Sequence, residues 1–241
     1  MADKVLVTGG TGSVGDAIVR TLRSKGFHVT FTYLRNAGRA INLEKETGAT
    51  ALQWSAGKPL AEATNVDVLV NNAGINVSRA FTARVQTAEW VETMNVNLWG
   101  ALELIQACLP SMVSREKGKI INIGSIYGLR GCEGNLPYNA SKHALHAVTK
   151  TVAMEYGRRG IICTEICPGP IKSELLVRIA AQKCGSNDQA IQEYLRSAAE
   201  EIPTGELVEP EEIAEAVLWM ILQKGKALNG ATLVMDGGLT L

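Results

Sequence analysis

Apolar strand-like segments alternate with helix-like segments along almost the whole chain, and this alternation constrains the fold more than any other feature. The expected strands are Lys4–Thr8, Val29–Tyr33, Ala49–Trp54, Val66–Asn71, Lys119–Ser125, Ile161–Cys167 and Ala231–Met235. The expected helices are Val14–Lys25, Asn36–Thr47, Ala88–Ser114, Asn139–Arg158, Ser173–Glu201 and Glu211–Gln223. Alternation of this kind predicts parallel strand pairing, with helices over both faces of the sheet.

The order of these segments indicates one doubly wound α/β domain. Its sheet is expected to have seven strands and to be mostly parallel, and no internal repeat or linker divides residues 1–241. Within the helix expected at Ala88–Ser114, Pro110 predicts a kink or an end, because proline cannot donate a backbone hydrogen bond.

The composition excludes several classes of function. Hydrophobic residues make up 46% of the chain, charged residues make up 20%, and the formal net charge is +0. Nothing in these values favours binding to nucleic acid or to an anionic membrane. The N-terminal sequence lacks the apolar core of a signal peptide, and no apolar run reaches the ~20 residues that span a bilayer. We therefore expect a cytoplasmic protein, whose five cysteines, an odd count, favour reduced thiols.

A glycine-rich loop follows the first expected strand. The sequence Thr8-Gly9-Gly10-Thr11-Gly12-Ser13-Val14-Gly15 has four glycines within seven residues and leads into a helix. Glycines allow a tight turn and a close approach of backbone N–H groups to a pyrophosphate, whose charge the helix N-terminus stabilises. The candidate dinucleotide-binding residues of a Rossmann-type domain are therefore Gly9, Thr11, Gly12, Ser13, Val14 and Gly15. The alternative is a plain turn between a strand and a helix.

The end of the second expected strand indicates which dinucleotide binds. Sites that prefer NAD usually have an Asp or Glu there for the ribose 2′-hydroxyl, whereas this chain has Thr32-Tyr33-Leu34-Arg35-Asn36. A guanidinium matches a 2′-phosphate in charge and geometry. We therefore expect NADP(H) with Arg35 as its anchor, while NAD(H) and a merely solvated Arg35 stay as alternatives.

Ser125, Tyr138 and Lys142 are the candidate catalytic residues. Tyr138 and Lys142 are four positions apart, which places both side chains on one face of a helix. A lysine ammonium next to a phenol favours the phenolate and lowers the tyrosine pKa from about 10 toward neutral pH. Tyr138 is thereby suited to exchange a proton with a carbonyl or alcohol oxygen.

Four motifs together make the chain resemble the short-chain dehydrogenase/reductase family over nearly its whole length. They are the glycine loop at 8–15, Asn71-Asn72-Ala73-Gly74, the trio just described, and Pro168-Gly169-Pro170-Ile171-Lys172-Ser173. Asn97 lies where the family has a fourth catalytic residue. The resemblance implies that further residues lie along the cofactor: Asn72, Ala73, Gly74, Pro168, Gly169, Ile171 and Ser173.

The resemblance also implies a role for each catalytic residue. Tyr138 gives a proton to a substrate carbonyl, or takes one from an alcohol, and Ser125 orients the same oxygen. Lys142 holds the nicotinamide ribose and lowers the tyrosine pKa, so Tyr138 and Lys142 are also expected at the cofactor. Asn97 supports a water that connects Lys142 to solvent. No metal is expected.

The chain departs from the family pattern at several positions. Gly12 stands where NADP-preferring members often have a Lys or Arg, Ser13 stands where the family's classical members have a glycine, and Ser55 replaces an Asp that contacts adenine. Only about ten residues separate Ser55 from the fourth strand, so the family's third helix is expected to be a turn or to be missing. Residues 173–203 resemble a long substrate lid. Its apolar residues suggest an apolar enclosure: Leu175, Leu176, Ile179, Ile191 and Leu195.

Other residues carry weaker hypotheses. His143 and His146 form an HxxH pair without an evident acidic or cysteine partner, which favours packing or an interface over a metal site. Cys163 and Cys167 share one face of a strand and are expected to pack as buried thiols. Residues expected around the substrate have mixed polarity and identify no substrate: Arg130, Cys132, Glu133 and Leu136.

The sequence therefore predicts an NADP(H)-dependent oxidoreductase that reversibly reduces a ketone, such as a 3-oxoacyl thioester, to a secondary alcohol. One alternative is an NAD(P)-dependent dehydrogenase of a sugar, steroid or hydroxy acid, and another is a non-catalytic nucleotide sensor on the same fold. The expected partners are a small-molecule or acyl-thioester substrate and further copies of the chain, because the family commonly forms tetramers through its long helices.

Overall fold

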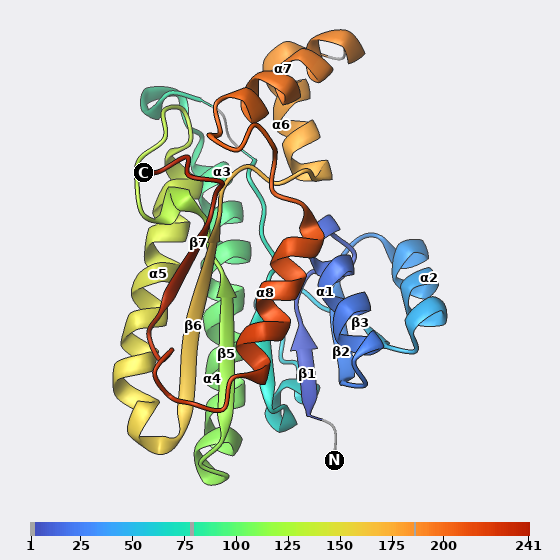
Figure 1. Cartoon of the computed structure of the whole chain (residues 1–241), viewed down its shortest axis with the longest axis vertical. Coiled ribbons are helices and arrows are strands. Elements are labelled where there is room, and N and C mark those ends of the chain that lie inside the picture. The colour runs from blue at the N-terminus through green and yellow to red at the C-terminus, as the bar shows by residue number, and fades with distance from the viewer. Residues whose placement is uncertain (1–2, 78–79, 186) are drawn as a thin grey trace.

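The computed structural model describes residues 3–77, 80–185 and 187–241. These residues form a seven-stranded sheet with the strand order β3-β2-β1-β4-β5-β6-β7, in which every neighbouring pair is parallel. The strands are β1 (Lys4–Val7), β2 (His28–Tyr33), β3 (Thr50–Gln53), β4 (Val68–Asn71), β5 (Gly118–Ile123), β6 (Ile161–Pro168) and β7 (Thr232–Met235). The expected α/β fold with a parallel sheet is confirmed (Figure 1).

Helices cover both faces of this sheet (Figure 1). They are α1 (Ser13–Ser24), α2 (Ala37–Thr47), α3 (Thr87–Met94), α4 (Gly100–Ser114), α5 (Leu136–Tyr156), α6 (Glu174–Cys184), α7 (Asp188–Glu200) and α8 (Pro210–Leu222). Buried residues of α1, α2 and α8 share one apolar cluster, whereas those of α4 and α5 share the other. The sheet is therefore the middle one of three layers.

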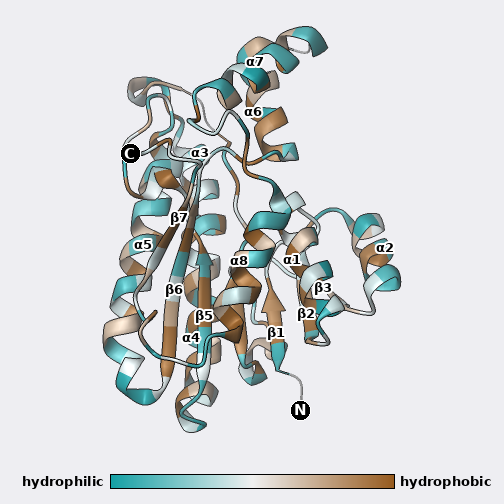
Figure 2. Cartoon of the chain, viewed as in Figure 1, coloured by the Kyte–Doolittle hydropathy of each residue, from teal (hydrophilic) through white to brown (hydrophobic). Residues whose placement is uncertain are grey.

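The strands divide their side chains between these two clusters. Val5 and Val7 of β1 belong to the α1/α8 cluster, whereas Leu6 between them belongs to the α4/α5 cluster. Successive strand side chains point to opposite faces, so a strand with helices on both sides needs apolar residues at every position. Figure 2 shows these strands as mostly hydrophobic. Each large side chain buried in this way contributes about 1.5–3 kcal/mol.

The chain changes direction across the sheet after β3. From β1 it proceeds outward to β2 and β3, and it then returns to β4 on the other side of β1. Loops that leave the carboxyl ends of β1 and β4 therefore diverge, and a crevice opens between them. The glycine loop after β1 and the segment that begins at Asn72 after β4 both lie at this crevice.

Several expected element boundaries shift in the structure. The short connection before β4 contains only a 3₁₀ turn, Ala61–Asn65, as expected from the missing residues. The helix α5 begins at Leu136 rather than Asn139, so Tyr138 lies within it. Residues 173–201 form two helices instead of one, because Gly185 adopts a φ of 73° and Asn187 caps α7.

The long helical run around α4 is irregular upstream of its proline. A π turn, Asn95–Trp99, separates α3 from α4, and α4 continues through Pro110 to Ser114. The helix therefore does not end at Pro110, and a kink there stays a prediction. The run Thr87–Ser114 has the length and apolar composition of a membrane span, but half of its most apolar window is buried inside the fold. It packs as a core helix does.

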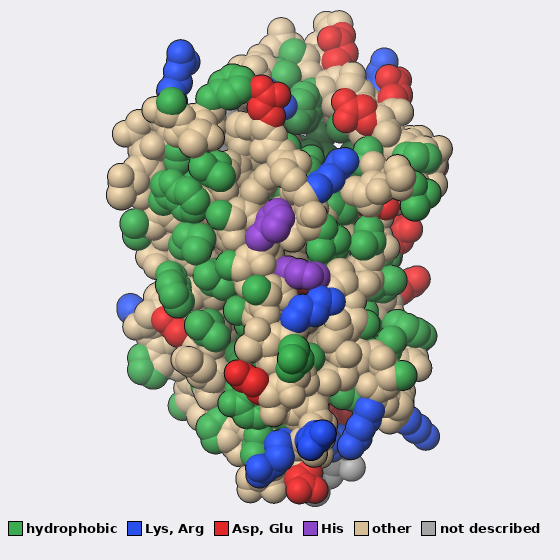
Figure 3. All heavy atoms as spheres, turned by 90° about the vertical axis from the view of Figure 1, so that its left-hand side faces the viewer, with side chains coloured by type: hydrophobic (Ala, Val, Ile, Leu, Met, Phe, Trp, Pro, Cys, Tyr) green, Lys and Arg blue, Asp and Glu red, His purple; other side chains and the backbone are tan. Residues whose placement is uncertain are grey.

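The helix α5 forms much of one side of the molecule. Figure 3 shows this side, where histidine and hydrophobic side chains lie around the middle with a basic side chain next to the histidines, and further charged side chains lie toward the two ends. Met154 of α5 is 85% exposed, and Trp99 at the start of α4 is 49% exposed. We refer to the outward sides of α4 and α5, which carry these two exposed side chains, as the apolar α4/α5 face.

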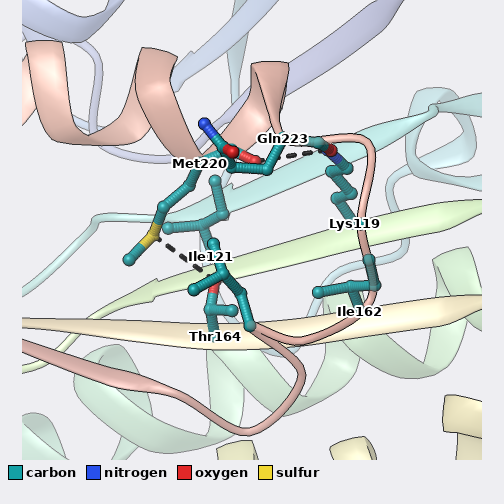
Figure 4. Close-up of a pocket in the computed structure, with 8 residues that line it drawn as sticks. Lys119, Ile121, Ile162, Thr164, Met220 and Gln223 are labelled. Atoms are coloured by element: carbon teal, nitrogen blue, oxygen red, sulfur yellow. Dashed lines mark hydrogen bonds between the residues drawn. The ribbon is translucent and has the colours of Figure 1, made fainter.

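Lys119 ties the amino end of β5 to the carboxyl end of α8. Its Nζ donates to the carbonyl oxygens of Met220, Ile221 and Gln223, and Figure 4 shows Lys119 beside Met220 and Gln223. Burial lowers the pKa of Lys119. The last carbonyls of a helix have no partner within the helix, and a cation there interacts favourably with the helix dipole. Lys119 therefore acts as a cap for α8, at the edge of the sheet opposite the crevice.

Candidate active site

The glycine loop is shaped by backbone contacts that leave no room for side chains. Gly9 has a φ of 67°, and a Cβ added to Gly15 would lie 2.2 Å from the Gly9 carbonyl oxygen. A Cβ added to Gly10 would lie 2.5 Å from the ring of Phe31 on β2. Two of the loop's turns therefore require glycine for steric reasons, and the backbone is free to approach a ligand on the open side.

The segment after β4 fixes this loop in place. The Thr8 hydroxyl accepts hydrogen bonds from the backbone N–H groups of Asn72 (2.9 Å) and Ala73 (2.8 Å). The Asn72 side chain donates to the carbonyl oxygens of Thr8 (2.8 Å) and Gly9 (3.3 Å). Asn72 and Ala73 are therefore structural partners of the loop as well as candidates for cofactor contact.

The loop and α1 fit the phosphates of a dinucleotide. Gly12 is the N-cap of α1 and makes no side-chain cap, and the nearest atom to a Cβ added there is the Gly9 carbonyl oxygen, 3.5 Å away. An uncapped helix N-terminus next to an open glycine loop presents backbone N–H groups and a positive dipole end to an anion. The residues present thus suit the pyrophosphate of NAD(P).

Ser125 and Lys142 lie behind this loop, at the end of β5 and on α5. Ser125 is 7% exposed, and its Oγ accepts a hydrogen bond from the Tyr127 backbone N–H at 3.1 Å. Lys142 is 3% exposed, and its Nζ donates to the Ile123 carbonyl oxygen at 2.8 Å. Burial lowers the pKa of Lys142 to about 8, because desolvation disfavours the ammonium.

Tyr138 lies one helical turn before Lys142, as the spacing predicts. The Lys142 Nζ is 5.7 Å from the centre of the Tyr138 ring. At that distance the ammonium stabilises negative charge on the phenol. Both side chains line the same cleft as Ser125.

Asn97 does not line the cleft; it lies directly behind the cleft wall in the π turn. Its Oδ1 accepts from the Ile75 N–H (2.8 Å), and its Nδ2 donates to the Ile75 carbonyl (2.9 Å) and the Ser141 Oγ (3.0 Å). A π turn, which often occurs at functional sites, places this side chain between the segment after β4 and α5. Asn97 therefore holds the cleft wall, and its relay role stays a prediction.

One cleft of about 420 Å³ contains Ser125 and all sixteen residues expected at the cofactor. They are Gly9, Thr11, Gly12, Ser13, Val14, Gly15, Arg35, Asn72, Ala73, Gly74, Tyr138, Lys142, Pro168, Gly169, Ile171 and Ser173. These residues come from five separate segments of the sequence. Their convergence supports the expected positions, while the role of each residue stays a prediction.

Arg35 extends into the mouth of the cleft. Its side chain is 85% exposed, and its Nη2 lies 3.9 Å from Glu92 Oε1. Exposed ion pairs of this length contribute little. The guanidinium is therefore available to an added anion, and Glu92 is a competing charge that the sequence did not indicate.

The beginning of the lid touches the cofactor loop. The Glu174 backbone N–H donates to the Ser13 Oγ at 3.3 Å, and the Glu174 carboxylate pairs with Arg39 of α2. The Ser173 hydroxyl caps α6 by accepting from the Leu176 N–H. Ser13, where the family pattern has glycine, thus connects the loop to the lid.

A second cleft of about 460 Å³ lies between the lid and the segment after β5. Its lining is Phe81, Tyr127, Cys132, Glu133, Gly134, Lys183, Tyr194, Ser197, Ala198 and Glu201. Cys132 and Glu133 thus lie where a substrate site was expected. Of the five apolar residues expected to enclose the substrate, Leu175 lines the cofactor cleft, whereas Ile179 and Ile191 are buried and line neither cleft. The apolar enclosure stays a prediction, and the lining of the second cleft is mixed.

Some of the residues that line the cofactor cleft were not identified from the sequence. Ile123, Gly124, Glu92 and Arg178 also line the cofactor cleft. His146 does have an acidic partner, because its Nδ1 lies 2.6 Å from Oε2 of the buried Glu165. That partner is nineteen positions away on a different element, so spacing could not reveal it. Within the described residues, no group of three or more His, Cys, Asp or Glu side chains could hold a metal.

Known proteins resemble this chain over its whole length. The family described as enoyl-(acyl carrier protein) reductase matches residues 9–240. The chain belongs to this family, within the short-chain dehydrogenases/reductases. It is 33% identical to acetoacetyl-CoA reductase of Rhizobium meliloti, over 99% of this chain and 98% of the relative.

Two solved structures extend the comparison. A variant of actinorhodin polyketide ketoreductase with NADPH has a TM-score of 0.88 and 28% identity, covering 99% of this chain and 97% of that one. Aldohexose dehydrogenase of Thermoplasma acidophilum has a TM-score of 0.89 and 26% identity, covering 99% and 94%. As a short-chain dehydrogenase/reductase, the protein is an oxidoreductase that acts on C=O and CH–OH groups.

Proposed function

We propose that the protein is an NADP(H)-dependent ketoreductase that reduces a 3-oxoacyl thioester to the 3-hydroxyacyl thioester. The observation that carries the proposal is the meeting of Ser125, Tyr138 and Lys142 with the glycine loop and Arg35 in one cleft. The name of the acetoacetyl-CoA reductase relative supports the thioester, and the ketoreductase structure with NADPH supports the phosphorylated cofactor.

The proposed chemistry assigns one task to each side chain. When bound, the reduced nicotinamide supplies the hydride that the carbonyl carbon receives. Tyr138 gives its phenolic proton to the carbonyl oxygen, which thereby becomes the hydroxyl of the product. Ser125 donates a hydrogen bond to the same oxygen and orients it. Lys142, a buried cation, stabilises the phenolate that Tyr138 leaves behind.

The cofactor would be held along the cleft by the chain's own residues. The loop from Gly9 to Gly15 and the N-terminus of α1 would bind the pyrophosphate. Arg35 would bind the 2′-phosphate through its exposed guanidinium. Gly74, Pro168 and Ile171 would lie along the nicotinamide half, where the cleft meets Tyr138 and Lys142.

A direct assay tests the proposal. Loss of NADPH absorbance, and separately of NADH absorbance, is followed with acetoacetyl-CoA, with a simple ketone and with no substrate. We expect turnover of acetoacetyl-CoA with NADPH and a much lower kcat/KM with NADH. Turnover of only the simple ketone would refute the thioester, and equal use of both cofactors would refute NADP(H) preference.

A second candidate is a dehydrogenase that oxidises a sugar or another polar secondary alcohol. The polar residues of the second cleft favour it, because Glu133, Lys183, Ser197 and Glu201 can bind hydroxyl groups. The structural likeness to an aldohexose dehydrogenase agrees with this reading. Reduction of NADP⁺ or NAD⁺ by glucose or related aldoses, with no turnover of acetoacetyl-CoA, would decide for it.

A further inference from the structure

A buried carboxylate and the candidate catalytic lysine both lie against the end of β5, where Lys142 Nζ donates to the Ile123 carbonyl and Glu165 Oε1 lies next to Gly124. Glu165 of β6 is 0% exposed. Among the described residues, the buried charged side chains are Lys142, Glu165 and Asp236. Asp236 is satisfied near the carboxyl end of the chain by the Gly238 N–H and the Thr240 hydroxyl. Glu165 therefore supplies the negative charge that accompanies the buried ammonium within the fold.

Electrostatics link Glu165 to Lys142. Burial lowers the pKa of Lys142, whereas the charge of Glu165 and the Cys167 thiol act in the opposite direction. Burial raises the pKa of Cys167 to about 12, so this thiol is neutral at physiological pH. Glu165 is thus the anion that offsets the cost of burying the Lys142 ammonium, a cost that is large for an unpaired charge.

His146 holds one oxygen of this carboxylate. Its Nδ1 lies 2.6 Å from Glu165 Oε2, and its side chain is 27% exposed while that of Glu165 is fully buried. His146 is one turn after Lys142 on α5, so the two side chains lie on the same face of the helix. Lys150, one turn further, instead donates to the Gly230 carbonyl and the Thr232 hydroxyl.

The other carboxylate oxygen lies against the backbone that precedes Ser125. A Cβ added to Gly124 would be 2.3 Å from Glu165 Oε1, so the missing side chain leaves the space that the carboxylate occupies. This oxygen is buried and has no hydrogen-bond partner in the described structure. The Cys167 thiol lies at the same position and interacts with the carboxylate, so the carboxylate faces a thiol of β6 as well as the buried ammonium.

We propose that Glu165 is the counter-charge that keeps Lys142 protonated, that His146 holds Glu165 in place, and that both are positioning residues for proton transfer at Tyr138. This inference rests on the proposed function, since it assigns the pair to the same reaction. Each neighbouring element contributes to the environment of Glu165. The facing groups are Lys142, His146 and Lys150 of α5, Cys163 and Cys167 of β6, Asn122 and Gly124 of β5, and Thr232 of β7.

The proposal predicts how the pKa of Lys142 changes when Glu165 or His146 is replaced. Without the negative charge of Glu165, the Lys142 ammonium loses its support and gives up its proton at a lower pH. Loss of His146 removes the side chain that contacts Glu165 Oε2, so the carboxylate is no longer held in position and the same support weakens. Glu165→Gln and His146→Ala are therefore both expected to lower the pKa of Lys142. For Glu165→Gln the expected decrease is roughly one pH unit or more.

The titration of Lys142 is the first measurement. Protein carrying isotope-labelled lysine is followed by NMR as a function of pH, and Lys142→Arg assigns the Lys142 resonance. We expect a lower midpoint in Glu165→Gln and in His146→Ala, and recovery toward the wild-type midpoint in His146→Gln, whose amide can still donate. His143→Ala is the matched control, because His143 is exposed on the same helix and contacts only the Asn139 carbonyl among the contacts described.

Turnover provides the second readout. The alkaline limb of the kcat–pH profile is expected to move to lower pH in the same variants and to stay in place in His143→Ala. An unchanged Lys142 midpoint in Glu165→Gln and His146→Ala would overturn the counter-charge, and a midpoint that moves while the kcat profile does not would overturn the positioning role. Wild-type protein that turns over no ketone would refute the proposed function instead, and the NMR midpoint would still test the counter-charge.

Discussion

At the scale of the residue, Tyr138 differs from its neighbours in the cleft because its proton is the one that the proposed reaction transfers. Its position on α5, one turn before a buried lysine, could be read from the spacing alone. The surroundings of Lys142, in contrast, could not be predicted from the spacing. Its contact with the Ile123 carbonyl and its closeness to Glu165 depend on how α5 packs on β5 and β6.

Tyr138→Phe tests the proton donor. Removing the hydroxyl leaves the ring and its packing, so we expect turnover to fall by roughly a hundredfold to ten-thousandfold, the usual contribution of a positioned acid. Binding of NADPH, followed by its fluorescence, should change little because the cofactor is held mainly by other residues. A variant that keeps about a tenth of wild-type kcat would contradict the assignment.

Arg35→Ala tests the 2′-phosphate anchor. A charge-assisted hydrogen bond to phosphate contributes about 1.5–3 kcal/mol, so the Kd for NADPH is expected to rise by roughly tenfold to a hundredfold. The Kd for NADH should stay close to its wild-type value. Arg178→Ala is the control, since Arg178 lines the same cleft from the lid. Equal losses for both cofactors in Arg35→Ala would remove Arg35 from the role.

At the scale of the element, the expected lid differs from the rest of the fold because its helices lie outside the apolar core. The helices α6 and α7 pack against each other, and neither apolar core cluster includes their residues. Glu174, Leu175 and Arg178, at the start of α6, line the cofactor cleft, whereas Lys183 and Tyr194 line the second cleft. The two ends of the segment expected to be a lid thus line different clefts.

Replacing residues 179–195 with a short Gly/Ser linker tests whether this segment binds the substrate or the cofactor. We expect the substrate KM to rise by roughly tenfold, equivalent to about 1.4 kcal/mol of lost contact, while the Kd for NADPH holds. Retention of a cooperative thermal transition would confirm that the core clusters persist. An unchanged KM would show that the segment does not bind substrate, and a matching loss of NADPH affinity would show that the lid serves the cofactor instead.

Elements that follow from local sequence could be predicted, and those that follow from packing could not. Buried strands such as β4 are continuous apolar runs, and the glycine loop requires its glycines locally, so both were evident. The π turn around Asn97 has no pattern that separates it from ordinary helix. The Glu165–His146 contact joins residues on different elements, so only the three-dimensional arrangement could show it.

At the scale of the whole molecule, the apolar α4/α5 face is the candidate contact for a second copy of the chain. Between Ala144 and Met154, the charged side chain is Lys150, and it is directed to β7 by its hydrogen bonds. His143, Ala147, Thr151 and Met154 follow one another at helical spacing on the exposed side of α5. Small and apolar residues at such spacing let two helices pack closely.

We therefore predict that the 25.8 kDa chain self-associates through this face. Light scattering coupled to size exclusion should give a mass of two or four chains for the wild type. Met154→Glu places a charge within the predicted contact and should shift the mass toward one chain, because an unpaired charge is costly to bury. Ile41→Glu, at an exposed apolar residue of α2 on the other side of the fold, is the matched control and should leave the mass unchanged.

A wild type that stays at the mass of one chain over the whole accessible concentration range, or a Met154→Glu variant that keeps the wild-type mass, would exclude this face as the contact. The active site lies on the sheet's carboxyl edge rather than on this face, so the single-chain variant should retain turnover if each copy carries a complete site.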